Sequence, residues 1–455
     1  MNKDVVIIGA GLTGLSAGVE LTKRGFSIAI LEKTNRSGGQ IRTFHEEGFT
    51  FESGPTTGSG ITEEVMTLFK ELNPDCEIEF AKKEAEKRLI WKNNKFHALP
   101  NGLWGGITTP LFTLSDKFRI LGEPWRAKGT DPDESVGSLA TRRLGKSFVD
   151  YAVEPFLSGV YAGNAYSLVT RHALPKLYQL EQNYGSFIRG AVAKAKETKM
   201  HPKPKAPSSI FSAKGGLESL PKAMTTYIGK DRIFLSAENI TIHPDPETGM
   251  WKTSCRQNGQ SLTFTSPHVI TTVGAYALPD ILPFADPTNL AKIANLRYAP
   301  VVQIAVGVKN KGKLNFNAFG GLISPKDKED FLGILFPSSC FNNRSPENGV
   351  LFSFFMGGMY RRELTELNDD EITDKVMRQF HRMLGFPIAK EPDLIRIFRH
   401  KYAIPQYERS SEERFKTVEL LEKKYPGLHL AGNLRDGIGM NQRITQGTKL
   451  AREIG

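Results

Sequence analysis

Apolar runs separated by glycines dominate the first thirty residues of the chain. Residues 5–8 are Val-Val-Ile-Ile, an uninterrupted run that predicts a buried strand, and apolar residues then recur at helical spacing from Leu12 to Val19. Gly25, just after two basic residues, predicts the end of that helix, and the apolar run at 28–31 predicts a second buried strand. The pattern therefore predicts the strand, helix, strand unit of a parallel α/β sheet.

The turn between the first strand and the helix carries Gly9, Gly11 and Gly14 in the spacing Gly-x-Gly-x-x-Gly. These glycines would allow a tight turn, close approach of the backbone to a pyrophosphate, and close packing of the helix on the strand. Glu32 ends the second strand, where an acid accepts hydrogen bonds from the hydroxyls of an adenosine ribose. A glycine turn without a ligand is the alternative, but the complete order of elements favours FAD or NAD.

Periodicity in the rest of the chain predicts a more complex architecture. We expect a hairpin at 88–100, helices at 136–144 and 148–161, a half-buried strand at 302–308 and a final helix from Asn441. Further strands are expected at 233–235, 269–273, 332–336 and 350–355. The predicted fold class is α/β, with an interrupted Rossmann-type FAD-binding domain at 1–85, 208–278 and 421–455. A mixed-sheet substrate-binding domain occupies 279–420, and a helical domain occupies 86–207.

Two later glycine-containing segments favour FAD over NAD. Gly38 and Gly39 follow the ribose acid after one short loop, where backbone without side chains can close over a flat ligand. Gly432 follows a late strand and precedes the last helix, an arrangement by which flavin enzymes with an interrupted nucleotide domain aim a helix at the flavin. Because no cysteine follows Cys340, we expect FAD to be bound without a covalent thioether.

The residues expected to bind the cofactor fall in three groups. Arg36 and Arg42 are the candidates for contacts with phosphates or flavin carbonyl oxygens, although loop arginines are also commonly solvated. The complete set is Gly9, Gly11, Leu12, Thr13, Gly14, Glu32 and Lys33, then Arg36, Gly38, Gly39, Gln40, Arg42, Gly54, Pro55 and Thr56, and finally Glu238, Asn239, Thr272, Gly432, Asn433, Ile438 and Met440.

Composition and charge exclude several other classes of protein. Three well-separated cysteines and no clustered histidines argue against a disulfide framework, a zinc site or any other metal site. The net charge of +11 is concentrated in residues 189–214, which predict an exposed basic linker interrupted by prolines, without the aromatic interleaving of nucleic-acid binding. We find no signal peptide or transmembrane segment. A cytoplasmic location, or a peripheral one on the cytoplasmic face of a membrane, is expected.

Four motifs in the middle of the chain resemble the oxygen-dependent protoporphyrinogen oxidases, within the wider flavin amine oxidase group. They are Arg88-Leu-Ile-Trp with His97-Ala-Leu-Pro-Asn-Gly-Leu, Asp131-Pro-Asp-Glu-Ser-Val with Arg142-Arg143-Leu144-Gly145, Gly159-Val-Tyr-Ala-Gly-Asn164, and Ile404-Pro-Gln-Tyr407. The resemblance runs along nearly the whole chain. It departs from the family near the last helix, where valines and an Asp-Cys pair are common and this chain has Ile438, Met440, Gln442 and Arg443. The resemblance therefore does not fix the contacts of that helix with the flavin.

The resemblance implies FAD, substrate and membrane-contacting domains, a porphyrinogen substrate, and dioxygen as the electron acceptor. It implies that Arg88 faces a substrate propionate and that the carbonyl of Gly159 faces pyrrole N–H groups. It also implies apolar pocket walls from Phe319, Leu322, Leu332, Leu335 and Phe355, which from the residues alone would be core positions. The basic stretch is expected to be a mobile surface loop, with contact to anionic lipid as the alternative. The nearly uncharged segment 103–114 is either interfacial or a buried loop between helices.

Alternative functions remain open at this level. Oxidation of coproporphyrinogen III to coproporphyrin III would use the same chemistry on a substrate with four propionates. An amine oxidase, a carotenoid desaturase, or a flavoprotein that binds porphyrin without oxidising it would share the N-terminal glycine motif. The sequence also leaves the oligomeric state open, a homodimer included, as well as the physiological electron acceptor.

Overall fold

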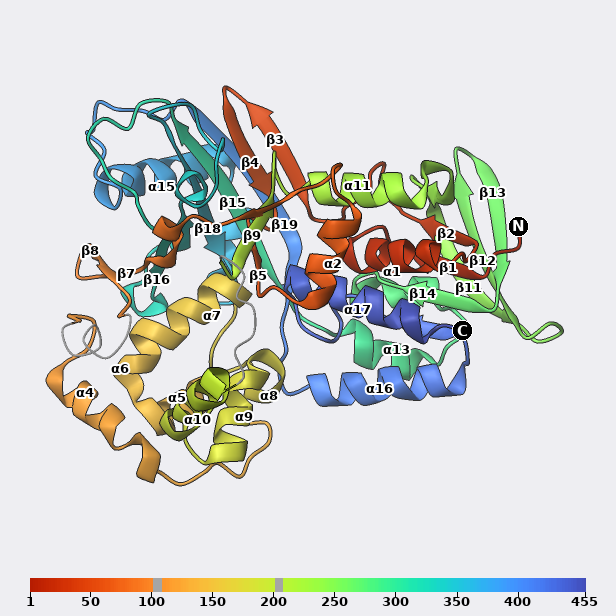
Figure 1. The fold of residues 1–455 in the computed structure, drawn as a ribbon, viewed down its shortest axis with the longest axis horizontal. Coiled ribbons are helices and arrows are strands. Elements are labelled where there is room, and N and C mark those ends of the chain that lie inside the picture. Colours follow the sequence, from red (N-terminus) through yellow and green to blue (C-terminus); the bar gives the residue numbers. More distant parts are fainter. Residues whose placement is uncertain (101–108, 201–207) are drawn as a thin grey trace.

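Segments from the start, middle and end of the chain meet in one parallel sheet. In this computed structural model, which describes residues 1–100, 109–200 and 208–455, the strand order is β10-β2-β1-β14-β20. All neighbouring strands run parallel. The strands are β1 (Val5–Ile8), β2 (Ile28–Leu31), β10 (Ile233–Phe234), β14 (His268–Thr271) and β20 (Leu428–Leu430). The predicted interrupted nucleotide fold is therefore present (Figure 1).

Each face of the parallel sheet is covered by a separate apolar core. Val5 and Ile7 of β1 point to one face, where α1 (Leu12–Lys23), α2 (Glu63–Glu71), α11 (Ser219–Ile228) and α17 (Met440–Glu453) pack. Val6 and Ile8 point to the other, against α12 (Leu278–Ile281), α13 (Pro287–Ala294), α16 (Ser411–Lys424) and the antiparallel sheet of β11 (Glu238–Asp245), β12 (Met250–Gln257) and β13 (Gln260–Ser266). Burial on both faces explains why these strands are continuously apolar.

A second, seven-stranded sheet has the order β19-β15-β18-β17-β16-β7-β8. Its strands are β7 (Arg88–Lys92), β8 (Lys95–Ala98), β15 (Tyr298–Val308), β16 (Gly320–Ile323), β17 (Phe331–Leu335), β18 (Val350–Gly357) and β19 (Leu394–Pro405). The expected hairpin at 88–100 is present in β7 and β8. It pairs with β16 at the edge of this sheet, although the predicted boundaries grouped it with the helices.

The long strand β15, which lies next to the edge strand β19, corrects the expectation of a half-buried strand, because every residue from Tyr298 to Val308 is buried. The helix α15 (Asp369–Arg382) covers one face, with Ile372 and Val376 in a shared core with Val302 and Ile304. The opposite face meets β4 through Phe49 and Ala305. The small residues Ala305 and Gly307, which alternate with the valines and isoleucine of β15, therefore indicate close packing against β4 on the opposite face.

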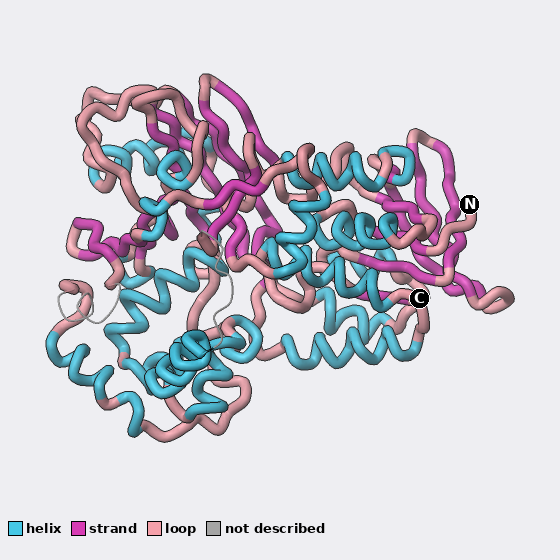
Figure 2. Tube along the Cα trace, in the orientation of Figure 1, coloured by secondary structure: helices cyan, strands magenta, loops and turns pink. Residues whose placement is uncertain are grey.

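Two small sheets accompany the two large ones, and several short helices join the longer elements. The strands β3 (Arg42–Glu46) and β4 (Phe49–Ser53) form a hairpin, and β5 (Gly58–Ser59), β9 (Ile210–Ala213) and β6 (Ile78–Phe80) form a three-stranded sheet. The short helices are η1 (Lys83–Glu86), η4 (Lys230–Arg232), η5 (Ala275–Ala277), η6 (Pro325–Asp327), α14 (Pro337–Cys340) and η7 (Arg362–Glu366). In Figure 2, which has the orientation of Figure 1, the strands at the places of β3, β4, β5 and β9 lie between the two large sheets.

The helical part of the chain forms a separate layer below the seven-stranded sheet in Figure 1. It contains α4 (Leu114–Leu121), η2 (Glu123–Trp125), α5 (Val136–Leu144), α6 (Lys146–Phe148), η3 (Val149–Val153), α7 (Glu154–Tyr161), α8 (Thr170–Ala173), α9 (Pro175–Tyr184) and α10 (Phe187–Met200). The predicted helix 136–144 is confirmed, and it ends at Gly145 with a φ of 98°. Among the described residues, we find no helix with the length and apolar character needed to cross a bilayer.

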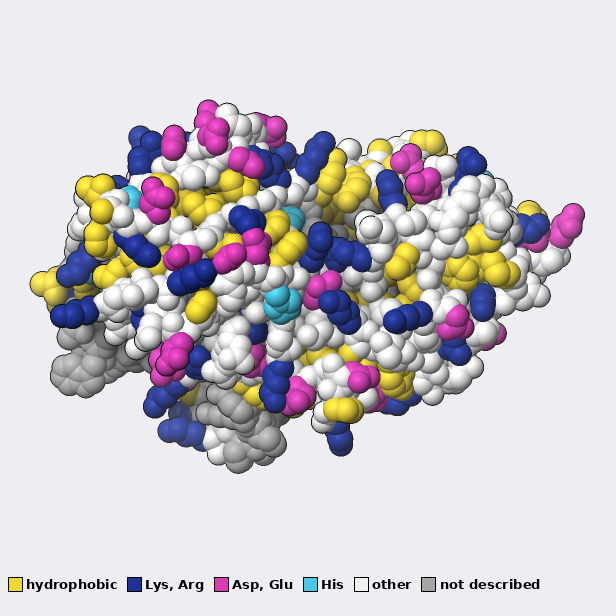
Figure 3. All heavy atoms as spheres, turned by 90° about the horizontal axis from the view of Figure 1, so that it is seen from above, with side chains coloured by type: hydrophobic (Ala, Val, Ile, Leu, Met, Phe, Trp, Pro, Cys, Tyr) yellow, Lys and Arg dark blue, Asp and Glu magenta, His cyan; other side chains and the backbone are white. Residues whose placement is uncertain are grey.

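The basic stretch 189–214 corrects a second expectation, because its first part is the helix α10 and not an irregular linker. Lys194 and Lys199 lie on exposed positions of that helix. The prolines at 202, 204 and 207, which led to the expectation of a linker, lie outside the described residues. On the face shown in Figure 3, Lys and Arg side chains are interspersed with Asp and Glu.

A buried ion-pair network holds the helical part together. Arg143 is fully buried, its guanidinium nitrogens lie close to carboxylate oxygens of Glu123 and Glu181, and Arg142 pairs with Glu181 at 2.8 Å. Glu123 in turn accepts hydrogen bonds from the backbone N–H groups of Phe187 (3.0 Å) and Ile188 (3.2 Å) at the start of α10. The Arg142-Arg143 motif is thus a structural element of this layer.

Candidate functional site

The carboxyl ends of the parallel strands bring three of the predicted cofactor segments together. The Thr272 hydroxyl, one residue beyond β14, donates hydrogen bonds to the carbonyls of Ile8 (3.0 Å) and Gly9 (3.1 Å). A Cβ at Gly432 would lie 2.8 Å from the carbonyl oxygen of Thr272, so the late glycine turn packs directly on it. Such a crevice beyond the carboxyl ends of parallel strands is where open α/β sheets bind ligands.

The glycines of the first turn have the geometry that pyrophosphate binding requires. A Cβ at Gly14 would lie 2.0 Å from the Gly9 carbonyl oxygen, whereas a Cβ at Gly11 would have no atom within 4 Å. Gly14 therefore serves helix packing, and Gly11 leaves open space beside the start of α1. That start has no acidic residue and no side-chain cap, and its first backbone N–H groups lack intrahelical partners.

A buried side chain in the first turn of α1 adds to the fit with a bound phosphate group. The hydroxyl oxygen of Thr13 is buried and has no hydrogen-bond partner in the described part of the protein. Buried polar groups are normally paired, so an unpaired hydroxyl at a helix start is typical of a place that a ligand completes. Ser16 also has an unpaired buried hydroxyl, but it packs against Gly447 of α17. The predicted contact residue Leu12 is buried at the first position of α1.

Glu32 is held rigidly at the end of β2. Its carboxylate accepts hydrogen bonds from the backbone N–H of Ala10 and from the N–H and hydroxyl of Thr34, all at 2.8 Å. Because a carboxylate has about four lone-pair positions, capacity remains for ribose hydroxyls. The predicted residues Glu238 and Asn239 are exposed and follow Ala237, whose N–H bonds to the Glu32 carbonyl, and Lys33 is exposed beside them.

The second glycine loop is anchored by its own arginine. Arg36 donates hydrogen bonds to the carbonyls of Gly39 (2.6 Å) and Ile41 (2.8 Å), while the Gly38 N–H bonds to the Ala10 carbonyl at 2.7 Å. Most of the Arg36 donor capacity is therefore used to shape the loop. Arg42 is exposed, with its guanidinium 4.5 Å from the centre of the Phe44 ring.

A buried glutamine joins the cofactor region to the seven-stranded sheet. Gln303 in β15 accepts a hydrogen bond from the N–H of Gly54 (2.7 Å) and donates one to the carbonyl of Glu52 (3.0 Å). It thereby fixes the predicted contact segment Gly54-Pro55-Thr56. A single buried glutamine in an apolar strand was the only sign of this role in the sequence.

Glu52 precedes this segment and is buried. Burial raises the pKa of its carboxyl to about 7. Hydrogen bonds from the Leu217 N–H (2.8 Å) and the Thr43 hydroxyl (2.7 Å) lower the pKa, but the effect of burial is larger. The carboxyl therefore sits between β4 and the turn before α11 and changes charge near neutral pH.

The late turn from Gly432 to Gly439 is held by buried aromatic and amide side chains. The Tyr407 hydroxyl lies 3.0–3.1 Å from the carbonyls of Asn433 and Gly437 and from the Gly437 N–H. The Tyr298 hydroxyl bonds to the Asn433 side chain at 3.1 Å. Gln442 caps α17, because its side-chain oxygen accepts hydrogen bonds from the N–H groups of Ile438 (3.0 Å) and Gly439 (2.9 Å) without adding charge.

The predicted substrate residues Arg88 and Gly159 lie close to the predicted apolar wall. The guanidinium of Arg88, which is exposed, lies 5.9 Å from the centre of the Phe319 ring. Arg88 is paired in register with Gly320, two residues before Leu322. A Cβ at Gly159 would lie 2.4 Å from a terminal carbon of Leu322, so this glycine lets α7 approach β16 closely.

The remaining predicted wall residues lie on neighbouring strands. Leu332 and Phe355 share one apolar cluster with Ala162, Ala299 and Val301, and Leu335 is paired with Gly320. Phe355 is paired with Gln303, the residue that holds the cofactor segment. These side chains are all half-buried. The structure thus brings the predicted substrate residues together on the sheet face that meets the cofactor region.

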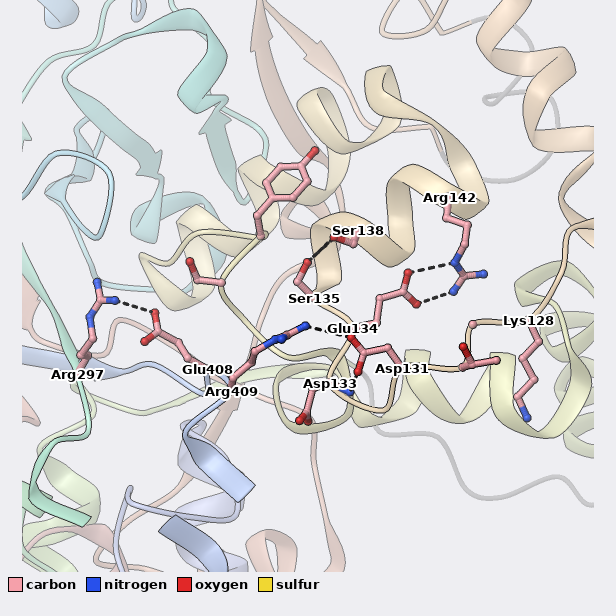
Figure 4. A pocket seen from close by; sticks show the side chains of 14 residues that line it. Lys128, Asp131, Asp133, Glu134, Ser135, Ser138, Arg142, Arg297, Glu408 and Arg409 are labelled. Carbon is pink, nitrogen blue, oxygen red and sulfur yellow. Dashed lines mark hydrogen bonds and ion pairs between the residues drawn. The ribbon is translucent and has the colours of Figure 1, made fainter. Parts of the chain in front are cut away.

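A polar cleft of about 810 Å³ lies elsewhere, between the helical part and the segment at 408–409 (Figure 4). Its charged side chains are mutually paired, with Arg409 3.0 Å from Asp131 and Arg142 2.6 Å from Glu134. Arg297 faces Glu408 at 3.4 Å. None of the predicted cofactor or substrate residues lines this cleft. The cleft is lined by ion pairs, and the pair of Arg409 with Asp131 joins the helical layer to the rest of the chain.

Fold and site together define a dinucleotide-binding flavoprotein of the interrupted Rossmann class. The chain belongs to the flavin containing amine oxidoreductase family, whose sequence profile matches residues 12–455. Membership of this family, with the fit of the glycine turn, Glu32 and the late turn, confirms the predicted FAD cofactor. The chain is therefore a flavin-dependent oxidoreductase.

Full-length relatives support the resemblance found in the middle motifs. Protoporphyrinogen oxidase 2 of Arabidopsis thaliana is 30% identical over 476 residues, which cover 99% of this chain and 93% of that protein. Human protoporphyrinogen oxidase is 28% identical, with 100% and 98% covered. A solved structure from Exiguobacterium sp. 255-15 superposes with a TM-score of 0.81 at 21% identity, covering 99% and 98% of the two chains, which supports the fold.

Proposed function

We propose that this enzyme oxidises protoporphyrinogen IX to protoporphyrin IX in haem biosynthesis, with dioxygen as the final electron acceptor. The observation that carries the proposal is full-length similarity to plant and animal proteins named protoporphyrinogen oxidase. The fold alone would not support it, since one fold hosts many reactions. The placement of Arg88, Gly159 and the apolar residues on one face agrees with such a substrate.

In this proposal the chain's own residues bind and orient a flat, apolar macrocycle with charged ends. Arg88 would meet a propionate with fixed, paired N–H donors, supported against the Phe319 ring. Leu322, Leu332 and Phe355 would cover the ring faces and exclude water. Gly159, which has no side chain, would present backbone to the pyrrole N–H groups. Bound FAD would supply the two-electron acceptor, and dioxygen would reoxidise it.

Orientation would provide most of the catalysis that the protein contributes. The product gains full conjugation, so the chemistry is strongly downhill and needs no strong protein acid or base. Holding the reacting carbon against the acceptor in the correct geometry lowers the barrier by making the reaction effectively unimolecular.

Aerobic turnover of two porphyrinogens tests the proposal. Purified enzyme is incubated with protoporphyrinogen IX or coproporphyrinogen III, and porphyrin fluorescence and oxygen uptake are followed against autoxidation. Faster turnover of protoporphyrinogen IX supports the proposal. Faster turnover of coproporphyrinogen III would instead assign that molecule as the substrate. No fluorescence above autoxidation with FAD-loaded enzyme would rule out both porphyrinogen oxidase activities.

Arg88→Ala separates substrate orientation from flavin chemistry. Loss of one charge-assisted contact of about 1.5–3 kcal/mol predicts a KM raised roughly ten- to a hundredfold, with kcat changed less. Arg256→Ala, at an exposed position of β12 away from the predicted cofactor and substrate residues, is the control. An unchanged KM in Arg88→Ala would refute the role in substrate binding.

We also propose that α4 attaches the enzyme to an anionic lipid surface. Leu114, Phe118 and Leu121 recur along one face of this helix and are 71%, 71% and 62% exposed, and Trp125 just beyond it is 80% exposed. Such a row is unusual on a soluble surface, and Arg119 and Arg126 flank it. In the segment 103–114, Leu111 and Phe112 are instead buried, and 101–108 lies outside the described residues.

Liposome flotation tests this attachment. Each side chain that leaves water contributes about 1.5–3 kcal/mol, so Phe118→Ser with Trp125→Ser is expected to weaken binding to phosphatidylglycerol vesicles at least tenfold. Leu420→Ser, at an exposed apolar position of α16, is the control. Equal binding of wild type and the double variant would refute α4 as the contact.

A further inference from the structure

Two buried arginines converge on the late turn beside the cofactor site. Arg443, in the second turn of α17, donates hydrogen bonds to the carbonyls of Gly432 and Arg435, the latter at 2.9 Å. Arg414, in α16, donates to the carbonyl of Leu434 at 3.0 Å. Their side chains are 8% and 0% exposed, so both charges are largely removed from water.

Neither arginine has a carboxylate at ion-pair distance among the residues that the structure describes. The partners of Arg414 are the Leu434 carbonyl, the Ser411 hydroxyl at 3.0 Å and the faces of two aromatic rings. Asp436 lies within the turn, but it is exposed and 3.8 Å from Arg435. It reaches Arg443 only through Gln446, which accepts a hydrogen bond from Arg443 and donates one to Asp436, both at 2.7 Å. Isolated buried cations are costly, which indicates that an anionic partner completes the site.

Both side chains also keep nitrogen atoms without a hydrogen-bond partner. These are Nη1 of Arg414 and Nε of Arg443, both buried within the described part of the chain. Burial lowers the pKa of both guanidinium groups, but not enough to remove their charge, because arginine remains protonated in proteins. The turn therefore retains a concentrated positive charge.

The turn faces the part of the cofactor site farthest from the ribose acid. Glu32 ends β2, Gly9 follows β1, Thr272 follows β14 and Gly432 follows β20, so these segments lie in this order across the sheet. A dinucleotide with its adenosine at Glu32 and its pyrophosphate at Gly11 extends its other end towards Gly432. The amino end of α17, with no acidic residue in its first turn, adds positive potential there.

We propose that Arg443 and Arg414 act together as an uncompensated positive charge that favours the reduced form of bound FAD. Uptake of two electrons and one proton leaves one negative charge on the flavin ring, and nearby positive charge stabilises that state relative to the neutral oxidised ring. They are positioning residues, since they also shape the turn. The proposal rests on FAD binding and not on the choice of substrate.

Redox titration of the bound flavin tests the proposal without any porphyrinogen. In Arg443→Gln, the ratio of reduced to oxidised FAD at a fixed ambient potential is expected to fall about tenfold, equivalent to about 30 mV for a two-electron couple. Arg443→Lys keeps the charge and is expected to stay within threefold of wild type. Arg435→Gln is the matched control, because Glu422 already neutralises that arginine at 2.8 Å.

The remaining outcomes also decide the matter. An unchanged ratio in Arg443→Gln, or an equal fall in Arg435→Gln, overturns the proposal. If Arg443→Gln folds by circular dichroism but releases FAD, Arg414→Gln takes its place in the titration with the same expectation. Release of oxidised FAD by both neutral variants overturns the proposal, because it assigns the two arginines to binding of the neutral oxidised form. Unchanged turnover with an altered ratio leaves the proposed function intact.

Discussion

Gly447 sets the distance between the two helices that point at the cofactor, and an alanine there is the sharpest test of this arrangement. A Cβ at this position would lie 2.2 Å from the Thr13 carbonyl oxygen and 3.0 Å from the Ala17 nitrogen. Both are backbone atoms of α1 and cannot rotate away. Because ordinary contact begins at 3.4 Å, α17 must move by at least about 1 Å.

Two opposing effects determine the size of the change. Alanine is favoured over glycine in a helix interior by about 1 kcal/mol, which stabilises α17. Overpacking of a rigid interface costs about 1–3 kcal/mol and is expected at its upper end here, because no side chain can adapt. The net loss is about 1–2 kcal/mol. The movement displaces the starts of α1 and α17 relative to each other, so FAD affinity should drop roughly five- to thirtyfold.

Fluorescence titration of the apoprotein with FAD, together with thermal unfolding, measures both effects. Gly18→Ala in α1 is the matched control, since its Cβ would lie 2.8 Å from Ile30 and 2.9 Å from Ile228 at flexible side-chain ends. Those methyl groups can shift, so this variant should keep its FAD affinity. The reasoning is refuted if Gly447→Ala binds FAD as tightly as wild type, or if both variants lose the same affinity.

Three further outcomes are expected. Glu52→Gln should remove a pH dependence of stability. The wild-type carboxyl has a pKa near 7 in the folded state and near 4.5 when unfolded, so the folded protein loses about 3 kcal/mol of stability as the pH rises from 5 to 8. The difference in melting temperature between wild type and variant should therefore change over that range. Arg143→Met leaves Glu123 buried without its cation, whereas Glu181 keeps Arg142, so we expect a loss of about 3 kcal/mol by chemical denaturation. A wild-type midpoint would contradict the buried network. Tyr407→Phe removes hydrogen bonds to the late turn, and we expect faster FAD release in dilution experiments, with unfolding free energy lowered by about 1–3 kcal/mol.

Local patterns predicted the nucleotide-binding half of the fold well. Glycine spacing, short apolar strands and the ribose acid depend on backbone geometry near each residue, and β1, α1 and β2 form as expected. Predictions failed where distant packing decides the outcome. The strand β15 is covered on both faces by elements more than fifty residues away in sequence, and α10 is a helix because Glu123 caps its start from another segment.

The same distinction applies to the candidate site. Gly9, Glu32 and Thr272 could be identified from motif and order, because their roles follow from the turns that contain them. Gln303 and Tyr407 could not, since each acts through hydrogen bonds to segments far away in the chain. Their polar atoms are buried inside apolar surroundings, and only the assembled structure shows what they hold.

These two residues also explain how the cofactor and substrate regions are coupled. Gln303 lies on the strand that pairs with Phe355 and bonds to the loop at Gly54, while Tyr407 follows β19 of the same sheet and bonds to the late turn. A shift of the seven-stranded sheet would therefore move both sides of the flavin site at once. Since catalysis by orientation tolerates little displacement, the large sheet must act as a rigid support for the cofactor as well as a wall for the substrate.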